Sequence, residues 1–573
     1  MRWIIPQVQD EPVKIISSQL GVSTMLARLL VLRGADTADA ADRFLNPQLS
    51  QLHDPFLMAG MEAAVTRVRS ALNRKEKILI YGDYDVDGTT AVVTLLAALR
   101  SLGGGASVHV PHRLEEGYGM RAEVMERAAA EGFGLVVSVD TGIREHEAVD
   151  RARECGIDCI ITDHHLPEDR LPAACAVLNP RRPDCAYPDK NLSGAGVCLK
   201  LVQALLGSRM NERLLRSYLK IVAIGTIADV VPLVGENRVI ASVGLSALMD
   251  ASPPAPNAGR RGLGALLAAS GLEGKNITAT DVAFRIAPRL NAAGRMDHAR
   301  EVIALFTAQD GDAAAIAQHL EILNRERQQV EERILNEALA QIDRRPEMMR
   351  RKILIIASKG WHRGVIGIVA SRLVERFHRP ALVVALEGEI GHGSGRSIRR
   401  FHLLNALDHA APLFERYGGH AQAAGFSLPA ARIEELADTL ERYAQTVLTE
   451  QDLDPELRVD LQVNLAEIDW VALADLKRLE PCGFGNPKPV LSASGKLEMP
   501  PRVMKEKHLK LRVGADGASF DAVGWNFASR TSQIQAGQFL EMAFTIEENK
   551  FFDEPSIQLV LRDIRETGLA DRP

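Results

Sequence analysis

The feature that most constrains the fold is the stretch 77–90, in which an apolar run ends directly in three carboxylates. Its sequence is Lys-Ile-Leu-Ile-Tyr-Gly-Asp-Tyr-Asp-Val-Asp-Gly-Thr-Thr. Four apolar residues, 78–81, are typical of a strand buried on both faces of a parallel sheet, and open α/β sheets bind ligands at the carboxyl ends of such strands. The like charges of Asp83, Asp85 and Asp87 repel one another unless a cation lies between them. The stretch therefore predicts a site for a hard divalent ion at one edge of the sheet.

Three later apolar segments end in the same kinds of side chain. Residues 135–140 lead into Asp140, and residues 159–165 end in Asp163, His164 and His165. Asp229 interrupts the apolar segment 221–231, where a buried carboxylate needs a partner. Carboxylates mixed with imidazoles favour Mn²⁺ over Ca²⁺, with Mg²⁺ as an alternative, and the surplus of carboxylates indicates two ions. Such a pair activates water beside a phosphoryl group, so metal-assisted hydrolysis of a phosphoester or phosphoanhydride is the predicted chemistry.

The order of the predicted elements divides the chain into five parts. Strand and helix patterns alternate from about 60 to 240, which predicts a mostly parallel sheet covered by helices. A charged helical pattern near 312–343 predicts a connecting helix, and a second, smaller α/β unit follows it. Strand-rich segments after about 455 predict a small β-barrel, for which an OB-fold is one of several candidates. The predicted boundaries are 1–50 for an N-terminal cap segment, 51–310, 311–345 for the connecting helix, 346–452, and 453–573 for the barrel.

Two glycine-rich segments of the second α/β unit, 391–400 and 418–425, carry basic residues and are expected to form loops. Closely spaced glycines let backbone N–H groups approach an anion, and Arg396 adds a guanidinium suited to a bidentate phosphate contact. Turns of glycine, serine and arginine are common, so either segment alone is weak evidence. Beside the metal site, they favour a substrate that contains phosphate.

Composition limits the class of protein. The 573 residues carry a formal net charge of −6, which argues against a protein coated in positive charge but leaves room for a local basic channel. The N-terminus lacks the apolar core of a signal peptide, and no apolar run reaches the roughly 20 residues of a membrane span. Six cysteines without a C-x-x-C pair favour free thiols in a reducing compartment. We therefore expect a cytoplasmic protein with no membrane partner.

Four ordered motifs resemble those of the DHH phosphoesterase superfamily. They are Asp83-Tyr-Asp-Val-Asp-Gly88, Val139-Asp-Thr-Gly142, Asp163-His-His165 and Ala228-Asp-Val-Val-Pro232. Along almost its whole length the chain is similar to the RecJ-type single-stranded-DNA exonucleases of that superfamily, with further matching pieces at 111–119, 288–295, 360–367, 393–397, 418–420 and 481–487. Cys482 departs from the aromatic or bulkier residue expected there, which concerns packing. The resemblance implies a DHH catalytic domain at 51–310, a DHHA1-type substrate-binding domain at 346–452 and an OB-like barrel at 453–573.

The same resemblance implies the activity and the roles of particular residues. It implies stepwise 5′→3′ hydrolysis of single-stranded DNA to mononucleotides, dependent on Mn²⁺ or Mg²⁺, in recombination and repair. The implied metal ligands are Asp85, Asp87, Asp140, His164 and Asp229. His165 completes the catalytic set by facing the scissile phosphate, while Asp83 and Asp163 either orient ligands or contact metal themselves. The implied contacts to DNA phosphates, including the 5′ end, are Arg113, Arg295, Ser394, Arg396 and His420.

The same resemblance implies binding partners and leaves two alternative functions open. Single-stranded DNA is the expected partner, a single-stranded-DNA-binding protein and a repair helicase are further implied partners, and we expect a monomer. One alternative is a DHH phosphodiesterase for short oligonucleotides or cyclic dinucleotides, which would not need the barrel. Another is a catalytically inactive DHH scaffold of a replication complex, against which the intact carboxylate and histidine set argues.

Overall fold

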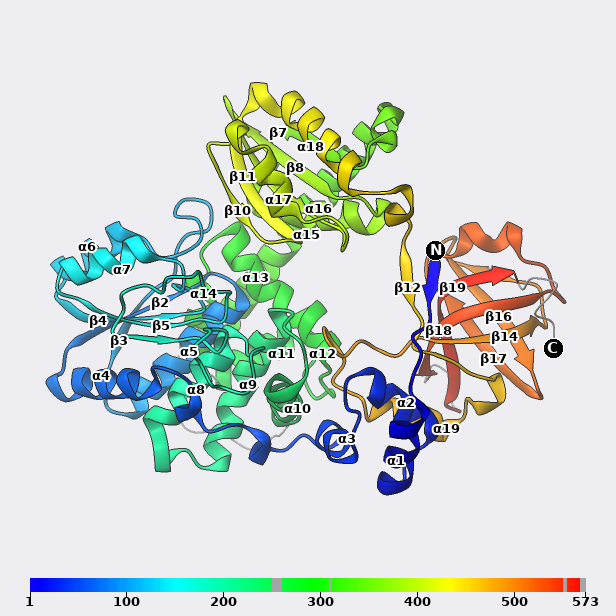
Figure 1. Cartoon of the computed structure of the whole chain (residues 1–573), viewed down its shortest axis with the longest axis horizontal. Helices are drawn as coiled ribbons and strands as arrows, with labels where there is room; N and C mark the ends of the chain where they lie inside the picture. The colour runs from blue at the N-terminus through cyan, green and yellow to red at the C-terminus, as the bar shows by residue number, and fades with distance from the viewer. Residues whose placement is uncertain (250–259, 309–311, 550–553, 567–573) are drawn as a thin grey trace. The chain divides into compact units, whose positions relative to one another are not determined.

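The computed structural model describes residues 1–249, 260–308, 312–549 and 554–566 (Figure 1). The chain forms two compact units. One comprises Asp54–Asp229 and Gly244–Pro455, and the other comprises Met1–His53, Val230–Val243 and Glu456–Pro573. Within the described ranges, no helix combines the length and the apolar character needed to cross a membrane.

The first α/β domain of the larger unit has a five-stranded sheet in the order β3-β2-β4-β5-β6, and every neighbouring pair is parallel. The strands are β2 (Lys77–Gly82), β3 (Ala106–His109), β4 (Phe133–Val139), β5 (Asp158–Thr162) and β6 (Ala176–Leu178). All residues of β2 after Lys77 are buried, as expected for a strand covered on both faces. The predicted parallel sheet is thereby confirmed.

Helices cover both faces of this sheet (Figure 1). Side chains of α6 and α7 share a core with Leu79, Tyr81 and Val136 of the strands. On the other face, α5 packs against α8 and α9. The helices are α4 (Met61–Arg74), α5 (Val86–Ser101), α6 (Ala122–Ala130), α7 (His146–Glu154), α8 (Gly194–Leu206) and α9 (Glu212–Ala228). Because the strands are parallel, their carboxyl ends meet at one edge of the sheet.

A long helix, α15 (Asp312–Arg344), connects this domain to the next, as the sequence predicts. This helix packs on α11, α13 and α14, and Ile334, Ala338 and Ile342 of its second half lie in the core of the following domain. The helices before it are α10 (Gly235–Met249), α11 (Arg260–Ala269), α12 (Ala279–Asp281), the π-helix η4 (Val282–Ile286), α13 (Ala287–Met296) and α14 (Arg300–Thr307).

The second α/β domain has a mixed sheet in the order β10-β11-β9-β8-β7, in which only β7 and β8 run parallel. Its elements are β7 (Leu354–Lys359), α16 (Arg363–Phe377), β8 (Ala381–Glu387), β9 (Ile390–Arg396), α17 (Leu403–His409), β10 (Arg416–Gly419), β11 (Ala423–Pro429) and α18 (Ile433–Val447). The expected glycine-rich loops are largely strands here. A Cβ on Gly393 would lie 2.1 Å from the ring of Phe426, so packing between β9 and β11 accounts for that glycine.

The smaller unit is a β-barrel joined to the N-terminal helices. Its strand order is β13-β14-β18-β19-β17-β16-β15, and a further pairing between β14 and β16 closes the barrel. The barrel elements are β13 (Leu461–Gln462), α19 (Trp470–Lys477), β14 (Leu491–Leu497), β15 (Arg502–Met504), β16 (His508–Ala515), β17 (Ala518–Gly524), β18 (Phe539–Asn549) and β19 (Ser556–Glu566). The predicted barrel is confirmed, although the short β15 was not expected.

Residues 1–50, which the sequence set apart as a cap, share one hydrophobic core with the barrel. Strand β1 (Arg2–Ile4) pairs in parallel with β12 (Glu456–Arg458). Helices α1 (Asp10–Leu20), α2 (Thr24–Leu32) and α3 (Ala38–Leu45) follow it. Ile16 and Leu30 lie in the same cluster as Leu509 and Phe544 of the barrel. The apolar faces of these helices are therefore covered by a segment from the far end of the chain.

Candidate metal centre and phosphate site

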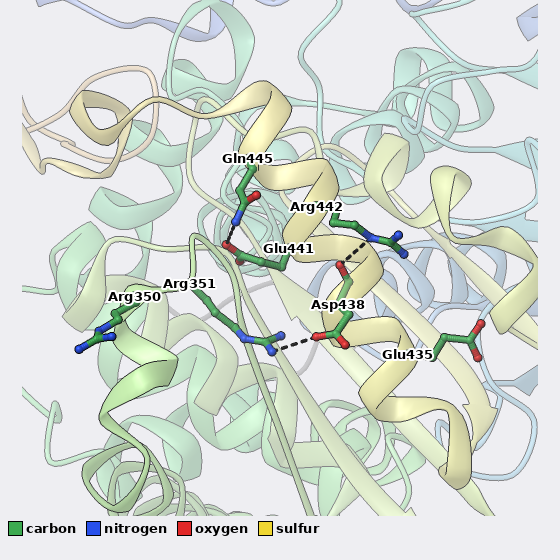
Figure 2. Close-up of a pocket in the computed structure, with 7 residues that line it drawn as sticks. All are labelled: Arg350, Arg351, Glu435, Asp438, Glu441, Arg442 and Gln445. Carbon is green, nitrogen blue, oxygen red and sulfur yellow. Dashed lines mark hydrogen bonds and ion pairs between the residues drawn. The ribbon is translucent and has the colours of Figure 1, made fainter.

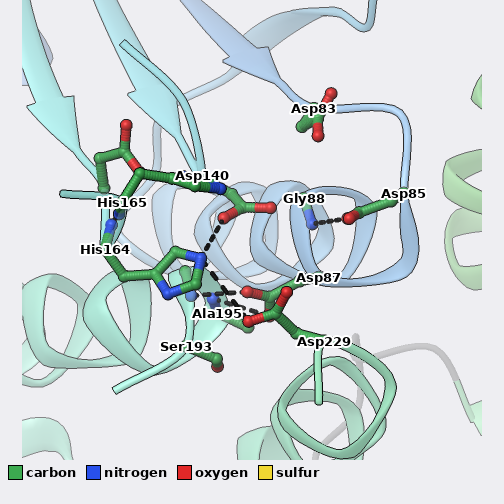
Figure 3. Close-up of polar contacts among 12 residues, drawn as sticks. Asp83, Asp85, Asp87, Gly88, Asp140, His164, His165, Ser193, Ala195 and Asp229 are labelled. Carbon is green, nitrogen blue, oxygen red and sulfur yellow. Dashed lines mark hydrogen bonds and ion pairs between the residues drawn. The ribbon is translucent and has the colours of Figure 1, made fainter. Parts of the chain in front are cut away.

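The acidic stretch that follows β2 turns into helix α5 and is fixed there by backbone N–H groups (Figure 3). Asp85 caps α5 and accepts the N–H of Gly88 at 3.0 Å. The carboxylate of Asp87 is fully buried and accepts the N–H groups of Gly194 at 2.6 Å and Ala195 at 3.1 Å. These two residues begin α8, so the positive end of that helix faces the carboxylate. Burial and the neighbouring charge of Asp85 nevertheless raise the pKa of Asp87 to about 7.

The remaining strands and α9 bring three further groups to the same edge. Asp140 follows β4 in the left-handed region, with φ +62°, which aspartate tolerates better than most residues. Its Oδ1 lies 3.2 Å from Nε2 of His164, and the same Nε2 lies 3.6 Å from Oδ2 of Asp229, the residue after α9. Among the described residues, none forms a hydrogen bond with Asp140 Oδ1, His164 Nε2 or Asp229 Oδ2. Three buried polar atoms thus face one another, and none of them takes part in a hydrogen bond with a described residue.

The electrostatics of this edge are those of an acidic cluster that needs a cation. Burial and the neighbouring carboxylates raise the pKa of Asp140 and Asp229 well above the usual range. Burial and the charge of Asp85 raise the pKa of Asp83 to about 8. A divalent cation between the carboxylates would favour their charged forms and reverse these shifts.

Three groups of side chains place their ligand atoms within 4.8 Å of one another: Asp87, His164 and Asp229; Asp83, Asp85 and Asp140; and Asp140, His164 and His165. Asp140 and His164 each belong to two of them. Carboxylate oxygens and imidazole nitrogens at this spacing fit Mn²⁺ or Mg²⁺. Since the groups share members, the arrangement suits two neighbouring ions.

Asp163 belongs to none of these groups and instead holds the two histidines that follow it. Its Oδ1 accepts the N–H of His164 at 2.7 Å and lies 2.7 Å from Nδ1 of His165, while Oδ2 accepts the N–H of Ile143 at 3.0 Å. Burial acts to raise the pKa of Asp163, but the bond to His165 and the charges of the two imidazoles lower it to about 2. A carboxylate held in this way orients His165.

A glycine is required where α8 approaches the acidic cluster. A Cβ on Gly194 would lie 2.3 Å from Oδ1 of Asp140 and 2.6 Å from its Cβ. The backbone of α8 therefore comes close enough to bind Asp87 only because position 194 has no side chain.

The predicted phosphate contacts gather around the start of α16. Arg295, near the end of α13, donates from Nη1 to the carbonyl oxygen of Gly364 at 3.0 Å. Arg396, the last residue of β9, donates to Oγ of Ser394 at 3.2 Å. A Cβ on Gly367 of α16 would lie 2.9 Å from that Oγ and 3.1 Å from Nη2 of Arg396. Helix α16 thus lies against three of the five predicted phosphate ligands, Arg295, Ser394 and Arg396.

These arginines form a positive cluster. Burial and the charges of Arg113 and Arg396 lower the pKa of Arg295 to about 9. Burial and the charge of Arg113 lower the pKa of Arg396, and the guanidinium of Arg113 lies 4.7 Å from the ring centre of Tyr84. The charges that act on Arg295 and Arg396 come mainly from other arginines, so the cluster suits an anion such as phosphate.

His420 is subject to charges other than those of the arginine cluster. It follows β10, and its backbone N–H donates to the carbonyl oxygen of Ala423 at 2.8 Å. Burial and the nearby positive charges of Arg144 and His165 lower the pKa of His420. The charge of His165 therefore acts on His420, which connects this residue electrostatically with the histidines.

A surface pocket of about 680 Å³ on the second α/β domain contains none of the predicted site residues (Figure 2). Its charges largely satisfy one another: Arg351 donates to Asp438 at 2.9 Å, and Glu441 accepts from Gln445 at 3.1 Å. Glu441 also accepts the backbone N–H of Lys352 at 2.9 Å. This pocket is thus a poor candidate for the chemistry.

Comparison with known proteins identifies the family. The model of the DHH family, N-terminal domain, matches residues 77–226, that of the DHHA1 domain matches 351–446, and that of the RecJ OB domain matches 459–563. The single-stranded-DNA-specific exonuclease RecJ of Bacillus subtilis is 37% identical over 568 residues, which cover 98% of this chain and 70% of that protein. This chain belongs to the RecJ family.

Two crystal structures of RecJ from Thermus thermophilus share the fold. The complex with Mn²⁺ has a TM-score of 0.85 and 30% identity, and the match covers 99% of this chain and 80% of that one. The complex with Mg²⁺ has a TM-score of 0.78 and 29% identity, covering 99% and 79%. The metals in these RecJ structures are the two that the donor set of this chain favours.

Sequence reasoning missed several residues of the site. Tyr118 places its hydroxyl 3.5 Å from Nδ1 of His165 and its ring 6.4 Å from that of Tyr84. Tyr118 lies within the segment 111–119 that resembles the family, and this position could have marked it as a site residue. The positive charge of Arg181 acts on both His164 and Asp229, and no local pattern marks it. Gly194 and Ala195, which hold Asp87, lie 107 and 108 residues from it.

Proposed function

We propose that this chain is a Mn²⁺- or Mg²⁺-dependent exonuclease that hydrolyses single-stranded DNA from the 5′ end to mononucleotides. The observation that carries the proposal is the convergence of carboxylates and a histidine from β2–α5, β4, β5 and α9 at one sheet edge, in a chain of the RecJ family. An intact cluster of ionisable donors argues against a scaffold without metals. The barrel, matched by the RecJ OB domain model, favours a polymeric substrate over a dinucleotide.

Each residue of the metal centre has a role in this proposal. Asp85, Asp87, Asp140, His164 and Asp229 would hold the ions, and Asp83 would lie close enough to join them. When bound, the ions lower the pKa of a water molecule and offset charge on the phosphoryl oxygens. Asp163 holds His165 toward the scissile phosphate, where its imidazolium offsets charge developing on a phosphate oxygen. Burial lowers the pKa of His164 to about 3, which keeps its Nε2 free to act as a ligand.

The arginine cluster supplies the grip on the strand. Arg113, Arg295 and Arg396, with Ser394, bind phosphates that include the 5′ end, and His420 binds nearer the histidines. The guanidinium groups of the three arginines form paired hydrogen bonds with phosphate oxygens. These bonds fix the position of the strand relative to the metals. Residues 51–310 then act as the catalytic domain, 311–345 as the connecting helix, 346–452 as the substrate-binding domain and 453–573 as a DNA-gripping barrel.

The cellular setting is part of the same proposal. Acting on single strands in recombination and repair, the enzyme works in the cytoplasm as a monomer. A single-stranded-DNA-binding protein and a repair helicase would supply and present its substrate.

A digestion assay tests the proposal directly. Purified protein is incubated with 5′- or 3′-labelled single and double strands, and with a dinucleotide, in Mn²⁺, Mg²⁺ or a chelator. We expect mononucleotides released from the 5′ end of single strands only, and only with metal. Preference for the dinucleotide, or degradation from the 3′ end, would contradict the proposal.

A further inference from the structure

Helix α16 links the two halves of the phosphate site. Its first turn accepts the hydrogen bond from Arg295 of the first α/β domain, and its Gly367 faces Ser394 and Arg396 of the second. A shift of α16 would therefore change the separation of Arg295 and Arg396. The contacts that hold α16 against α15 therefore also determine the distance between these two phosphate ligands.

A shared carboxylate joins α16 to α15. Glu331 of α15 accepts from Nη1 of Arg327 on its own helix and from Nε of Arg372 on α16, the latter at 3.2 Å. The side chains of Arg327 and Glu331 are only 10% and 12% exposed. Buried ionic groups depend strongly on their partners, so a carboxylate between two guanidiniums holds both in place.

Arg327 extends this junction toward the phosphate site. Its Nη2 donates to Oδ1 of Asn324 at 3.0 Å, and its buried Nε has no partner among the described residues. Its positive charge is one of those that lower the pKa of Arg295. Arg327 therefore lies behind the arginine cluster, with Glu331 balancing its charge.

The other end of α15 is anchored to the first domain by a similar contact. Glu321 pairs with Arg289 of α13 at 2.6 Å, and α13 is the helix that carries Arg295. The acids of α15 thus reach α13 through Glu321 and α16 through Glu331. Each anchored helix touches or carries a predicted phosphate ligand.

We propose that Glu331 is a positioning residue for the phosphate site, which holds α16 against α15 so that Arg295 and Arg396 are spaced for the 5′-terminal phosphate of a DNA strand. The inference rests on the proposed function. It concerns recognition of the strand end and not the metal centre, so its effect falls on KM.

The test compares variants at the two carboxylates that share Arg372. Glu331→Gln removes the buried partner, and Glu375→Gln removes the exposed one, which lies 3.3 Å from Nη1 of the same arginine. Substrates are single strands of one sequence with a 5′ phosphate or a 5′ hydroxyl. Glu331→Gln is expected to raise KM for the phosphorylated strand by about tenfold, equivalent to about 1.4 kcal/mol, with kcat and the Mn²⁺ requirement unchanged. The preference over the hydroxyl strand shrinks by the same factor, and Glu375→Gln shifts neither value.

A second variant guards against simple loss of folding. Arg372→Met removes the guanidinium that pairs with Glu331, and the side chain of Arg372 is 54% exposed. This variant is expected to show the same rise in KM, whereas Arg372→Lys should show a smaller rise. The inference is overturned if folded Glu331→Gln and Arg372→Met, even with a lower Tm, keep the wild-type preference for a 5′ phosphate. Failure of the wild type to digest single strands would instead refute the proposed function itself.

Discussion

The metal centre and the arginine cluster both bring like charges together in a partly buried environment, but the charges are of opposite sign. In the first, burial and neighbouring carboxylates raise the pKa of Asp140 and Asp229, and in the second, burial and neighbouring guanidiniums lower the pKa of Arg295 and Arg396. Neither set balances its own charge. The acidic side is built by strand ends and helix ends of a single domain. The basic side instead draws on α13 of one domain and on β9 and α16 of another.

That difference indicates which step each region controls. A cluster within one sheet edge can hold ions at fixed separations with no help from other domains. A cluster divided between two domains depends on how those domains are joined, and so suits recognition of a substrate that spans them. Changes on the acidic side should therefore affect the chemical step, and changes on the basic side should affect capture.

The largest effect is expected from Asp140→Ala, which removes a carboxylate common to two ligand groups. Loss of metal-ion stabilisation worth several kcal/mol should lower kcat by about a thousandfold or more. Because the variant also removes a repelling charge, the metal-free Tm should not fall, and binding of single strands should persist. Digestion rates, DNA binding and Tm check this, with the exposed Asp169→Asn as control. Near-normal hydrolysis would remove Asp140 from the centre.

Arg396→Ala tests the other side of the comparison. We expect KM for a 5′-phosphorylated strand to rise by about 10- to 100-fold, because a charge-assisted phosphate contact is lost, while kcat at saturating DNA changes little. The exposed neighbour Arg399→Ala should have no comparable effect. A fall in kcat at unchanged KM would mean that the arginine cluster acts in the chemical step and not in substrate capture.

Gly194→Ala alters the geometry of the acidic side without changing its charge. The added methyl would collide with Oδ1 of Asp140, so the Mn²⁺ concentration for half-maximal activity should rise by about tenfold. Gly105→Ala, where a Cβ meets nothing within 4 Å, is the matched control. If both variants need the same Mn²⁺ concentration as wild type, the close approach of α8 does not matter for metal binding.

The smallest effect is a pH dependence of the metal-free protein. The pKa values of Asp87 and Asp83, about 7 and about 8, exceed that of an aspartate in the unfolded chain. At pH values between the unfolded and the folded pKa, the folded state therefore binds more protons than the unfolded state. Stability should then fall as pH rises from about 5 to about 8, and saturating Mg²⁺ should abolish the slope. Asp163, with its lowered pKa, acts only below this window. Thermal melts with and without Mg²⁺ measure it, and a metal-free Tm that rises with pH would contradict the charge assignment.

Local patterns were sufficient to predict that these acidic side chains would meet at one edge of the sheet. Apolar runs that end in Asp83, Asp140 and Asp163 place acids at the ends of parallel strands, and parallel strands bring their ends together. The same reasoning could not find the N–H groups that hold Asp87, because a contact across more than a hundred residues leaves no local mark. Residues 391–396 of the expected loop belong to strand β9 instead, because glycine at alternate positions serves close sheet packing as well as turns.

The association of the N-terminal helices with the barrel affects how the protein is made. Arg2 and its partner Glu456 are separated by 454 residues. At synthesis rates of roughly 5 to 20 residues per second, β1 waits on the order of 20 to 90 s before its partner strand leaves the ribosome. Throughout that interval Ile16, Leu26 and Leu30 lack the barrel side chains that complete their core. The core that these helices share with the barrel can therefore be completed only after residues 461–564 have been synthesised.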